Sequence, residues 1–231
     1  MAQGPKNINC VNCPFKLTLF QHLTKDELAY LDENRYEVSF NAGETIFKQG
    51  GVLTHMAAVT SGLFKIYLED SNKNNLVLAI TKPPGILGGP GFMTDSKHYF
   101  SVSALENSSV CLIDIKAFEK VLRQNQELSI NFIGYLNQKH IVMYEKLISL
   151  THKNMHGRVA DTLLYLANSV YNSSDFNTTL SRQGLADLSS LAKESYIRIL
   201  KEFKDSGVIQ FEGNNFKIID QKALQKISQI S

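Results

Sequence analysis

The sequence lacks tryptophan altogether and has only three cysteines and five prolines among its 231 residues. Three cysteines are too few, and odd in number, for the disulfide framework that is typical of small secreted domains. No apolar run reaches the roughly 18 residues that a membrane-spanning helix requires. The first 13 residues also lack the basic-then-apolar pattern of a secretory signal. These absences predict a cytoplasmic protein with no membrane segment.

The chain has no large excess of either charge, because its formal net charge is only +2. A nucleic-acid-binding surface would therefore be a local arrangement of basic side chains and not a property of the whole chain. The cysteines have no paired base, and the chain has no phosphate-binding loop, so we do not expect an enzyme. The hydrophobic content of 43% is sufficient for one large domain or two modest ones.

Residues 37–115 consist of short apolar segments separated by glycine and Asx turns, such as Asn41–Gly43 and Ser61–Gly62. Short strands at this spacing are typical of an antiparallel sandwich or barrel. The expected strands are Glu37–Phe40, Thr45–Phe47, Met56–Thr60, Phe64–Leu68, Leu76–Ile80, Val102–Leu105 and Val110–Ile113.

Helical patterns flank this region. Residues 14–36 have apolar side chains at helical spacing, with a capping box formed by Thr24 and Glu27. A second helix is predicted from Gln126 to about Leu150. A helix of this length with one apolar stripe suits a coiled-coil seam between two subunits, and the alternative is a core helix packed on its own domain. The stripe consists of Leu128, Phe132, Leu136, Met143, Leu147 and Leu150.

The segment Ser181–Lys204 has the pattern of a helix-turn-helix. Ser181 is a suitable N-cap, and Ser189–Ala192 form the turn. The second helix is predicted to begin near Lys193, with Ile197, Leu200 and Phe203 facing inward and Lys193, Glu194, Ser195, Arg198 and Lys201 facing outward. Such a face presents donors and one acceptor where a recognition helix meets base edges. A hairpin over residues 208–219 would complete a winged helix-turn-helix.

This segment resembles the DNA-binding motif of the CRP/FNR family of regulators. The resemblance rests on Arg182-Gln183, on Glu194-x-x-x-Arg198, on Arg198-Ile-Leu200 and on Asp205-Ser-Gly-Val-Ile209. It implies that Glu194 accepts from a cytosine amino group and that Arg198 donates to guanine. It also implies that Ser181 and Arg182 hold phosphates. The residues assigned to the DNA-binding surface are Ser181, Arg182, Gln183, Lys193, Glu194, Ser195 and Arg198.

The resemblance extends to the N-terminal part, where Phe40–Gly50 and Val59–Tyr67 are similar to a cyclic-nucleotide-binding-type β-roll. Binders of cyclic nucleotides hold the ribose with a Gly-Glu pair and the phosphate with an arginine. Here Gly88-Gly89 replaces that pair, and no arginine lies between Arg35 and Arg123. Cyclic AMP is therefore disfavoured as the effector. The predicted effector pocket comprises Ile86, Leu87, Gly88, Gly89, His98, Tyr99 and Phe100.

The cysteines occur as Cys10-x-x-Cys13 and Cys111 in the predicted last strand of the roll. Oxygen-sensing members of the family hold a [4Fe–4S] cluster with such an N-terminal group and a strand cysteine, which makes these three the candidate metal ligands. A cubane cluster takes four thiolates, and the fourth family position falls near Leu19. The cofactor remains open between an iron–sulfur cluster, haem, and an unknown small ligand or none.

The sequence thus predicts an α+β fold with an N-terminal antiparallel β-roll, a long dimerisation helix and a C-terminal winged helix-turn-helix. The expected divisions are residues 1–13 (N-terminal segment), 14–119 (roll), 120–150 (dimerisation helix) and 151–231 (DNA-binding domain). The predicted function is transcription regulation by a homodimer on a roughly palindromic double-stranded DNA site, controlled by an effector or redox signal. An activator would also contact RNA polymerase. The alternatives are a cyclic-nucleotide-binding regulatory module and a redox or metal-binding protein that uses the CxxC pair.

Overall fold

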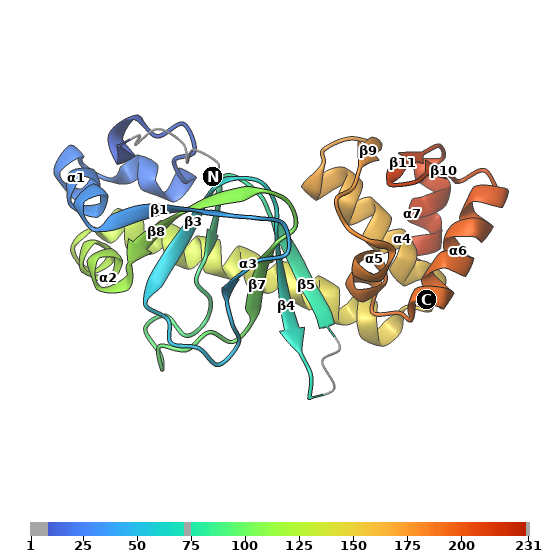
Figure 1. The fold of residues 1–231 in the computed structure, drawn as a ribbon, viewed down its shortest axis with the longest axis horizontal. Helices are drawn as coiled ribbons and strands as arrows, with labels where there is room; N and C mark the ends of the chain where they lie inside the picture. Colours follow the sequence, from blue (N-terminus) through green and yellow to red (C-terminus); the bar gives the residue numbers. More distant parts are fainter. Residues whose placement is uncertain (1–8, 72–74, 230–231) are drawn as a thin grey trace. The chain divides into compact units, whose positions relative to one another are not determined.

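The computed structural model describes residues 9–71 and 75–229. Within these ranges the chain folds into two compact units, one of residues 9–69 and 80–141 and the other of residues 70–71, 75–79 and 142–229. Figure 1 shows the strands of the N-terminal part and the mainly helical C-terminal part. Within the described ranges, no helix combines the length and apolar character needed to cross a membrane.

Eight short strands form the N-terminal β-roll, as two antiparallel sheets with the orders β1-β8-β3-β6 and β2-β7-β4-β5. The predicted antiparallel roll is confirmed. The sequence pattern missed β6, a three-residue strand whose first residue is the glycine of Pro83-Pro84-Gly85. The strands are β1 (Arg35–Phe40), β2 (Thr45–Phe47), β3 (His55–Ser61), β4 (Phe64–Glu69), β5 (Asn75–Thr81), β6 (Gly85–Leu87), β7 (Ser101–Ala104) and β8 (Ser108–Asp114).

The core of the roll is formed by inward side chains of both sheets. Val59, Phe64, Leu87, Val102 and Val110 are almost completely buried in one cluster. Strand side chains alternate between two faces, so β-branched and aromatic residues at every second position create such a layer. Burial of each side chain of this size stabilises the fold by about 1.5–3 kcal/mol.

A second cluster joins the N-terminal helices to the outer side of the roll. Two short 3-10 helices (Cys10–Asn12 and Thr18–His22) and α1 (Lys25–Glu33) pack with α2 (Ile115–Gln124) and the start of α3 (Gln126–His152). The capping box is confirmed, since Thr24 and Glu27 bond reciprocally. The helical character predicted for residues 14–36 is confirmed for Thr18–His22 and for α1, but not for the end of the range, where Arg35 already pairs with β8.

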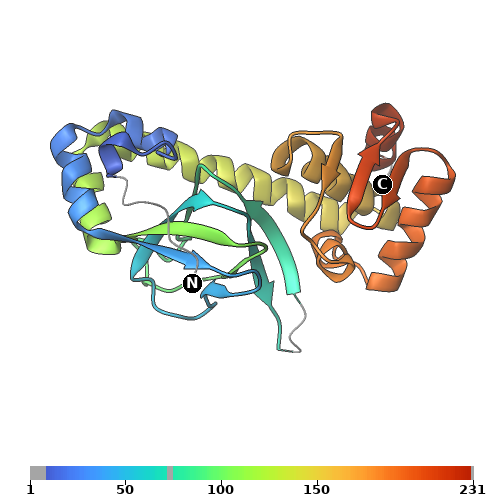
Figure 2. The same ribbon diagram turned by 45° about the horizontal axis from the view of Figure 1, so that its top comes forward.

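The long helix α3 spans 27 residues and confirms the helix predicted from Gln126 (Figure 2). Its apolar residues fall on two faces. Leu128 and Phe132, predicted as part of the dimer stripe, are buried in the core of their own unit, so that assignment is wrong for these two. The exposed apolar side chains of α3 are Ile130, Ile133, Ile141, Val142, Met143, Tyr144, Leu147 and Ile148.

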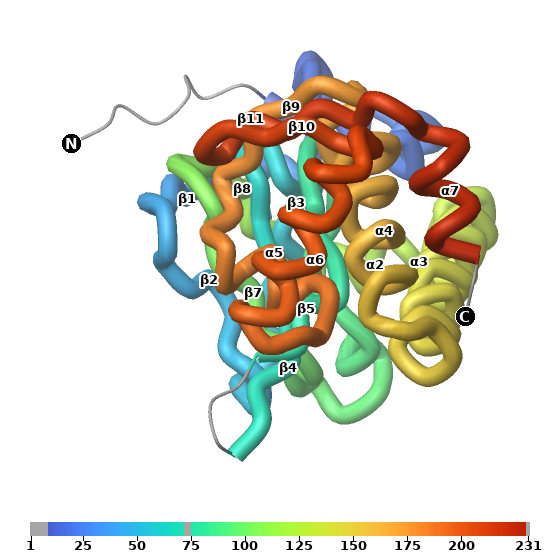
Figure 3. Tube along the Cα trace, turned by 90° about the vertical axis from the view of Figure 1, so that its right-hand side faces the viewer, coloured from blue at the N-terminus to red at the C-terminus, as the bar shows by residue number. Residues whose placement is uncertain are grey.

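The C-terminal unit contains a helix-turn-helix and a small sheet with the order β10-β11-β9. Figure 3 traces these three strands together and shows α5 leading into α6. Ile197, predicted to face inward, is only half-buried, whereas Tyr196 and Ile199 are completely buried. The elements are α4 (Met155–Tyr165), a π-helical turn (Leu166–Val170), β9 (Asp175–Asn177), α5 (Arg182–Ser189), α6 (Lys193–Asp205), β10 (Ile209–Glu212), β11 (Asn215–Ile218) and α7 (Gln221–Gln229).

Two glycines of the roll test how tightly its turns are packed. Gly43 (φ +89°) and Gly62 (φ +76°) both adopt the left-handed conformation. A Cβ on Gly43 would meet nothing, whereas a Cβ on Gly62 would lie 2.8 Å from the Cα atom of Ser108. We predict that Gly62→Ala lowers the free energy of unfolding by about 2 kcal/mol more than Gly43→Ala, because only the former adds a clash to the left-handed strain. Urea denaturation measures both, and equal losses would contradict this packing.

Candidate functional site

The helix-turn-helix begins and ends with defined caps. The Ser181 hydroxyl accepts a hydrogen bond from the Gly184 N–H (3.1 Å), so α5 begins at Arg182 as predicted. Helix α5 ends at Ser190, which adopts the left-handed conformation with φ 53°. Ala192 then precedes α6 without making any side-chain cap. This single left-handed residue turns the chain from α5 into α6.

Side chains from α3 and α4 form hydrogen bonds with the turn between α5 and α6. The Arg158 Nη1 donates to the Ser190 carbonyl (3.2 Å), and the Lys146 Nζ donates to the Leu188 carbonyl. The Ser189 hydroxyl donates to Thr162 Oγ1 (2.9 Å). The last carbonyls of a helix have no partner within it. Two cations from α3 and α4 satisfy such carbonyls at the end of α5 and suit the negative end of its dipole.

The outer face of α6 carries the residues that the sequence assigned to base contacts. Lys193, Glu194 and Arg198 are exposed, and Ser195 is half-buried. Glu194 and Arg198 are four residues apart and therefore share one face of the helix. The first turns of α6 thus present an acceptor and a bidentate donor to solvent.

Arg198 is already engaged within the helix. Its Nη1 donates to Glu202 Oε1 (2.7 Å), and Glu202 Oε2 lies 2.6 Å from His156 Nε2. The hydrogen bond with His156, together with Arg198, lowers the pKa of Glu202. Because both partners of the Arg198–Glu202 pair are exposed, the pair adds little to stability and its opening costs little.

The side chains at the start of α5 have intramolecular partners as well. Arg182 stacks on Phe211 and Phe216, with 5.4 and 5.0 Å between its Cζ and the ring centroids, and donates to the Gly213 carbonyl in the hairpin turn. Gln183 is exposed and donates to Asp187 (2.7 Å). Arg182 therefore ties α5 to the β10–β11 wing, and its contact with a DNA phosphate remains a prediction.

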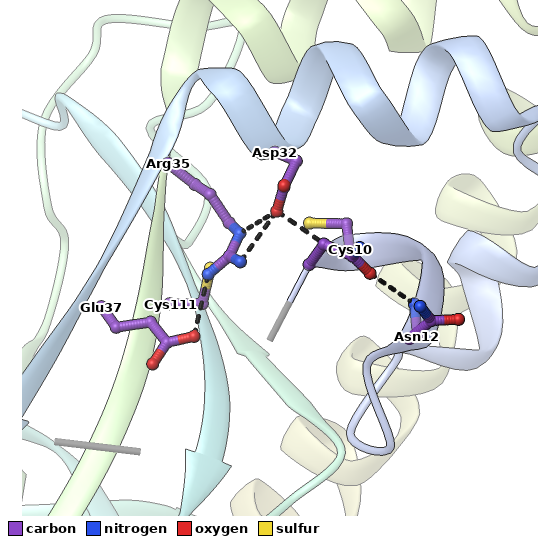
Figure 4. Close-up of polar contacts among 7 residues, drawn as sticks. Cys10, Asn12, Asp32, Arg35, Glu37 and Cys111 are labelled. Carbon is purple, nitrogen blue, oxygen red and sulfur yellow. Dashed lines mark hydrogen bonds and ion pairs between the residues drawn. The ribbon is translucent and has the colours of Figure 1, made fainter. Parts of the chain in front are cut away.

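The structure brings two of the predicted metal ligands, Cys10 and Cys111, close to a charged cluster (Figure 4). Arg35 lies at its centre and donates to Asp32 (2.8 Å), to Glu37 (3.0 Å) and to the sulfur of Cys111 (3.4 Å). The Cys10 N–H donates to the same Asp32 oxygen at 3.0 Å. The Arg35 side chain is only 6% exposed, so its two carboxylate partners offset a buried charge.

The environment of these thiols favours their protonated form. Burial raises the pKa of Cys10 to about 12, although Arg35 acts in the opposite direction. Burial also raises the pKa of Cys111, and the Cys10 and Cys111 thiols influence each other electrostatically. Cys13 is half-buried and near enough to act on Cys111. A metal ligand or a nucleophile must be the thiolate, which this arrangement disfavours.

The arrangement of the three candidate ligands, Cys10, Cys13 and Cys111, does not fit a [4Fe–4S] cluster. Among residues 9–71 and 75–229, no group of three or more His, Cys, Asp or Glu side chains is placed to hold a metal ion. Arg35 lies against one of the sulfurs, and Leu19, near the fourth family position, is a buried apolar residue. Four thiolate ligands are the usual requirement of a cubane cluster.

The predicted effector residues gather around the end of β6. A Cβ on Gly88 would lie 2.3 Å from the Met56 sulfur, and one on Gly89 would lie 2.8 Å from the Phe100 ring. His98 is buried and hydrogen-bonded with the backbone of Gly88, and burial lowers its pKa. These glycines therefore permit close packing of Met56 and Phe100 where a ribose-binding pair would stand.

The other residues of the predicted effector pocket differ in how deeply they are buried. Ile86 and Leu87 are buried, with Leu87 in the core of the roll. Tyr99 is exposed and donates to Asp95 (2.9 Å). The His98 ring stacks on Phe47 with 4.3 Å between centroids, and its Nδ1 has no hydrogen-bond partner in the part of the chain that the structure describes.

Some residues that matter for this geometry were missed from the sequence. Lys146 and Arg158 hold the turn, and Arg35, Asp32 and Glu37 surround the thiols. Basic and acidic residues in helices usually form a solvated face, so no local pattern distinguishes them. The third strand of the wing sheet, β9, was also missed because it is only three residues long.

Comparisons with known proteins define the class first. The family model described as "Cyclic nucleotide-binding domain" matches residues 37–125, and the model described as "Crp-like helix-turn-helix domain" matches residues 157–227. A sensor domain of the cyclic-nucleotide-binding type thus precedes a DNA-binding domain in one chain.

Similar whole proteins agree with this class. The chain is 27% identical to the "Transcriptional regulatory protein btr" of Bordetella pertussis, over 87% of this chain and 85% of that protein. It is 25% identical to the "Electron transport regulator A" of Shewanella oneidensis, over 96% and 90% of the two chains. The structure of FixK2 from Bradyrhizobium japonicum has the same fold, with a TM-score of 0.78, 18% identity and coverage of 85% and 98%. This chain belongs to the CRP/FNR family and is a DNA-binding transcription regulator.

The buried thiols yield a prediction about reactivity. In the native protein at pH 7.5, Cys10 and Cys111 should react with iodoacetamide at least about tenfold more slowly than in the urea-unfolded chain, because burial keeps both as thiols. Peptide mass spectrometry resolves the three sites. Native rates at Cys10 and Cys111 that equal the unfolded rates would show that the cluster in Figure 4 does not protect them.

Proposed function

We propose that two copies of this chain bind a roughly palindromic DNA site and that α6 of each copy reads one half-site in the major groove. The observation that carries this proposal is the exposed Glu194–Arg198 face of α6, fixed by the left-handed turn at Ser190. Arginine matches the two acceptors of guanine, and glutamate accepts from the cytosine amino group. The two residues thus provide a donor and an acceptor for adjacent base edges.

Arg198 would exchange Glu202 for guanine on binding. The Arg198–Glu202 hydrogen bond is on the surface, so its loss is a small cost against a bidentate base contact. Glu202 would retain His156 as a partner. Lys193, Ser195 and Gln183 would complete the contact surface, with Ser181 and Arg182 next to the phosphate backbone.

The exposed apolar face of α3 supports a dimer. Ile130, Ile133, Tyr144 and Leu147 follow the three- and four-residue steps of a coiled-coil seam, with Asn137 and His140 at the intervening seam positions. Ile133 is 58% exposed and Tyr144 63% exposed. A second copy of the same helix would bury these side chains in a two-fold interface.

The signal would enter through the β-roll. One route is a small effector at the Gly88, Gly89 and His98 group, and the other is redox chemistry at the cysteines, whose arrangement does not fit a metal cluster. Cys111 lies in β8, which leads directly into α2 and then α3, so a change there would shift the population of dimer arrangements with different DNA affinity.

We further propose that the protein acts in the cytoplasm, where an activator form would contact RNA polymerase.

The base-contact proposal predicts separate losses from two substitutions. Glu194→Ala and Arg198→Ala should each weaken binding to the selected DNA site by about 1–3 kcal/mol, roughly five- to 150-fold, because each removes one base contact. Lys222→Ala, an exposed residue of α7, is the matched control and should change binding less than twofold. Fluorescence anisotropy measures the dissociation constants. Unchanged sequence-specific binding by both α6 variants would refute the assignment.

The seam proposal predicts that a charge on the exposed face of α3 separates the subunits. Ile133→Glu and Tyr144→Glu should convert a dimer into a monomer at micromolar concentration, because each buries an unpaired charge at the interface. Gln138→Glu adds the same charge to the same helix outside the seam positions and should leave the dimer intact. Sedimentation velocity separates the two species. A wild-type monomer, or dimers in all three variants, would argue against this seam.

A further inference from the structure

A cavity of about 340 Å³ lies behind the helix-turn-helix, within the C-terminal unit. Its walls come from the last turns of α3, from α4, from the end of α5 and from Leu78 of β5. A pocket of this size is at the lower end of the range for small-molecule sites. It is separate from the exposed face of α6 and from the thiols and glycines of the β-roll. The lining residues used below are Glu145, Lys146, Ser149, Lys153, Arg158 and Asp161.

The charged side chains that line this cavity differ in their hydrogen-bond and ion-pair partners. The lining carries three cations, Lys146, Lys153 and Arg158, and two anions, Glu145 and Asp161. Asp161 is fully engaged, because Lys153 (2.9 Å) and Ser228 donate to its Oδ1 and Ser149 donates to its Oδ2 (2.6 Å). Glu145 is exposed to solvent. Within residues 9–71 and 75–229, Lys146 and Arg158 are therefore the two lining cations without an ion pair to a carboxylate within 4 Å, although Asp161 still acts on Lys146 electrostatically.

Both of these cations have donors beyond those that hold the turn. Arg158 uses Nη1 for the Ser190 carbonyl, and its buried Nε has no hydrogen-bond partner among the described residues. An unpaired buried donor is destabilising, so a ligand that accepted a hydrogen bond from it would be favoured. Lys146 has three N–H donors, of which one reaches the Leu188 carbonyl.

Electrostatics supports an anionic occupant. Burial lowers the pKa of Lys146 to about 8, Asp161 acts in the opposite direction, and Arg158 lowers it further by repulsion. Two neighbouring cations with reduced access to water are stabilised by an anion placed between them. Lys and Arg are also the usual ligands of phosphate groups.

We propose that this cavity is a binding site for a small organic phosphate, with Lys146 and Arg158 as the residues that hold the phosphate group. The cavity volume exceeds that of a phosphate ion and leaves room for an organic part of a few atoms beside the apolar wall of Val142 and Leu188. Because the same two side chains cap the end of α5, an occupant would act directly on the support of the recognition helix.

Isothermal titration of the full-length protein with glycerol 3-phosphate tests the site, with inorganic phosphate and neutral glycerol as the comparison ligands. We expect saturable binding of glycerol 3-phosphate with a dissociation constant of roughly 1 mM or tighter, weaker binding of inorganic phosphate and none of glycerol. Lys146→Gln and Arg158→Gln should each weaken binding at least about tenfold, and Lys222→Gln should not change it. The absence of saturable binding of either phosphate, or equal binding by all three variants, would overturn the proposal.

A second measurement does not depend on the folding of any variant. Glycerol 3-phosphate should slow the acetylation of Lys146 by an amine-directed reagent in the wild-type protein, and acetylation of exposed Lys222 should stay constant. Quantitative peptide mass spectrometry follows both lysines. Equal acetylation of Lys146 with and without glycerol 3-phosphate would refute the site. Neither assay uses DNA, so its failure is distinguishable from failure of the DNA-binding proposal.

Discussion

The helix-turn-helix depends on how the end of α5 is held. Ser190 adopts a left-handed conformation that costs a residue with a Cβ about 1–2 kcal/mol, and the carbonyls around it have no partners within α5. Lys146 from α3 and Arg158 from α4 supply those partners. The direction of α6, and with it the position of Arg198, therefore follows from two cations that lie far from it in sequence. The same arrangement leaves the basic cavity on the opposite side of the turn.

In the β-roll, Gly88 and Gly89 stand at the position where binders of cyclic nucleotides hold the ribose. A Cβ on Gly88 would meet the end of the Met56 side chain, and Gly89 adopts φ +99° next to the Phe100 ring, so both glycines have an explanation in local packing or backbone conformation without any ligand. Cys111 is buried next to Arg35, Cys10 is half-buried, and burial raises the pKa of both thiols.

The sequence was sufficient for features that depend on local patterns. Alternating apolar residues indicated seven of the strands, and the Thr24–Glu27 box and Ser181 marked the starts of α1 and α5. The sequence was insufficient for features that depend on contacts between residues far apart in the chain. The apolar stripe of α3 did not reveal that Leu128 and Phe132 belong to the core while Ile133 and Tyr144 are exposed, because helical spacing gives a face but not its partner. The roles of Arg158 and Lys146 arise only when α3, α4 and α5 come together.

The central claim is that two copies of α6 read two symmetric half-sites, and selection of DNA from a random double-stranded library by the full-length protein tests it most directly. The account predicts enrichment of one inverted repeat whose half-site centres are about one helical turn, ~34 Å, apart, with G·C pairs at the positions that Arg198 and Glu194 would contact. Enrichment of a direct repeat, of an isolated half-site or of no sequence at all would contradict it.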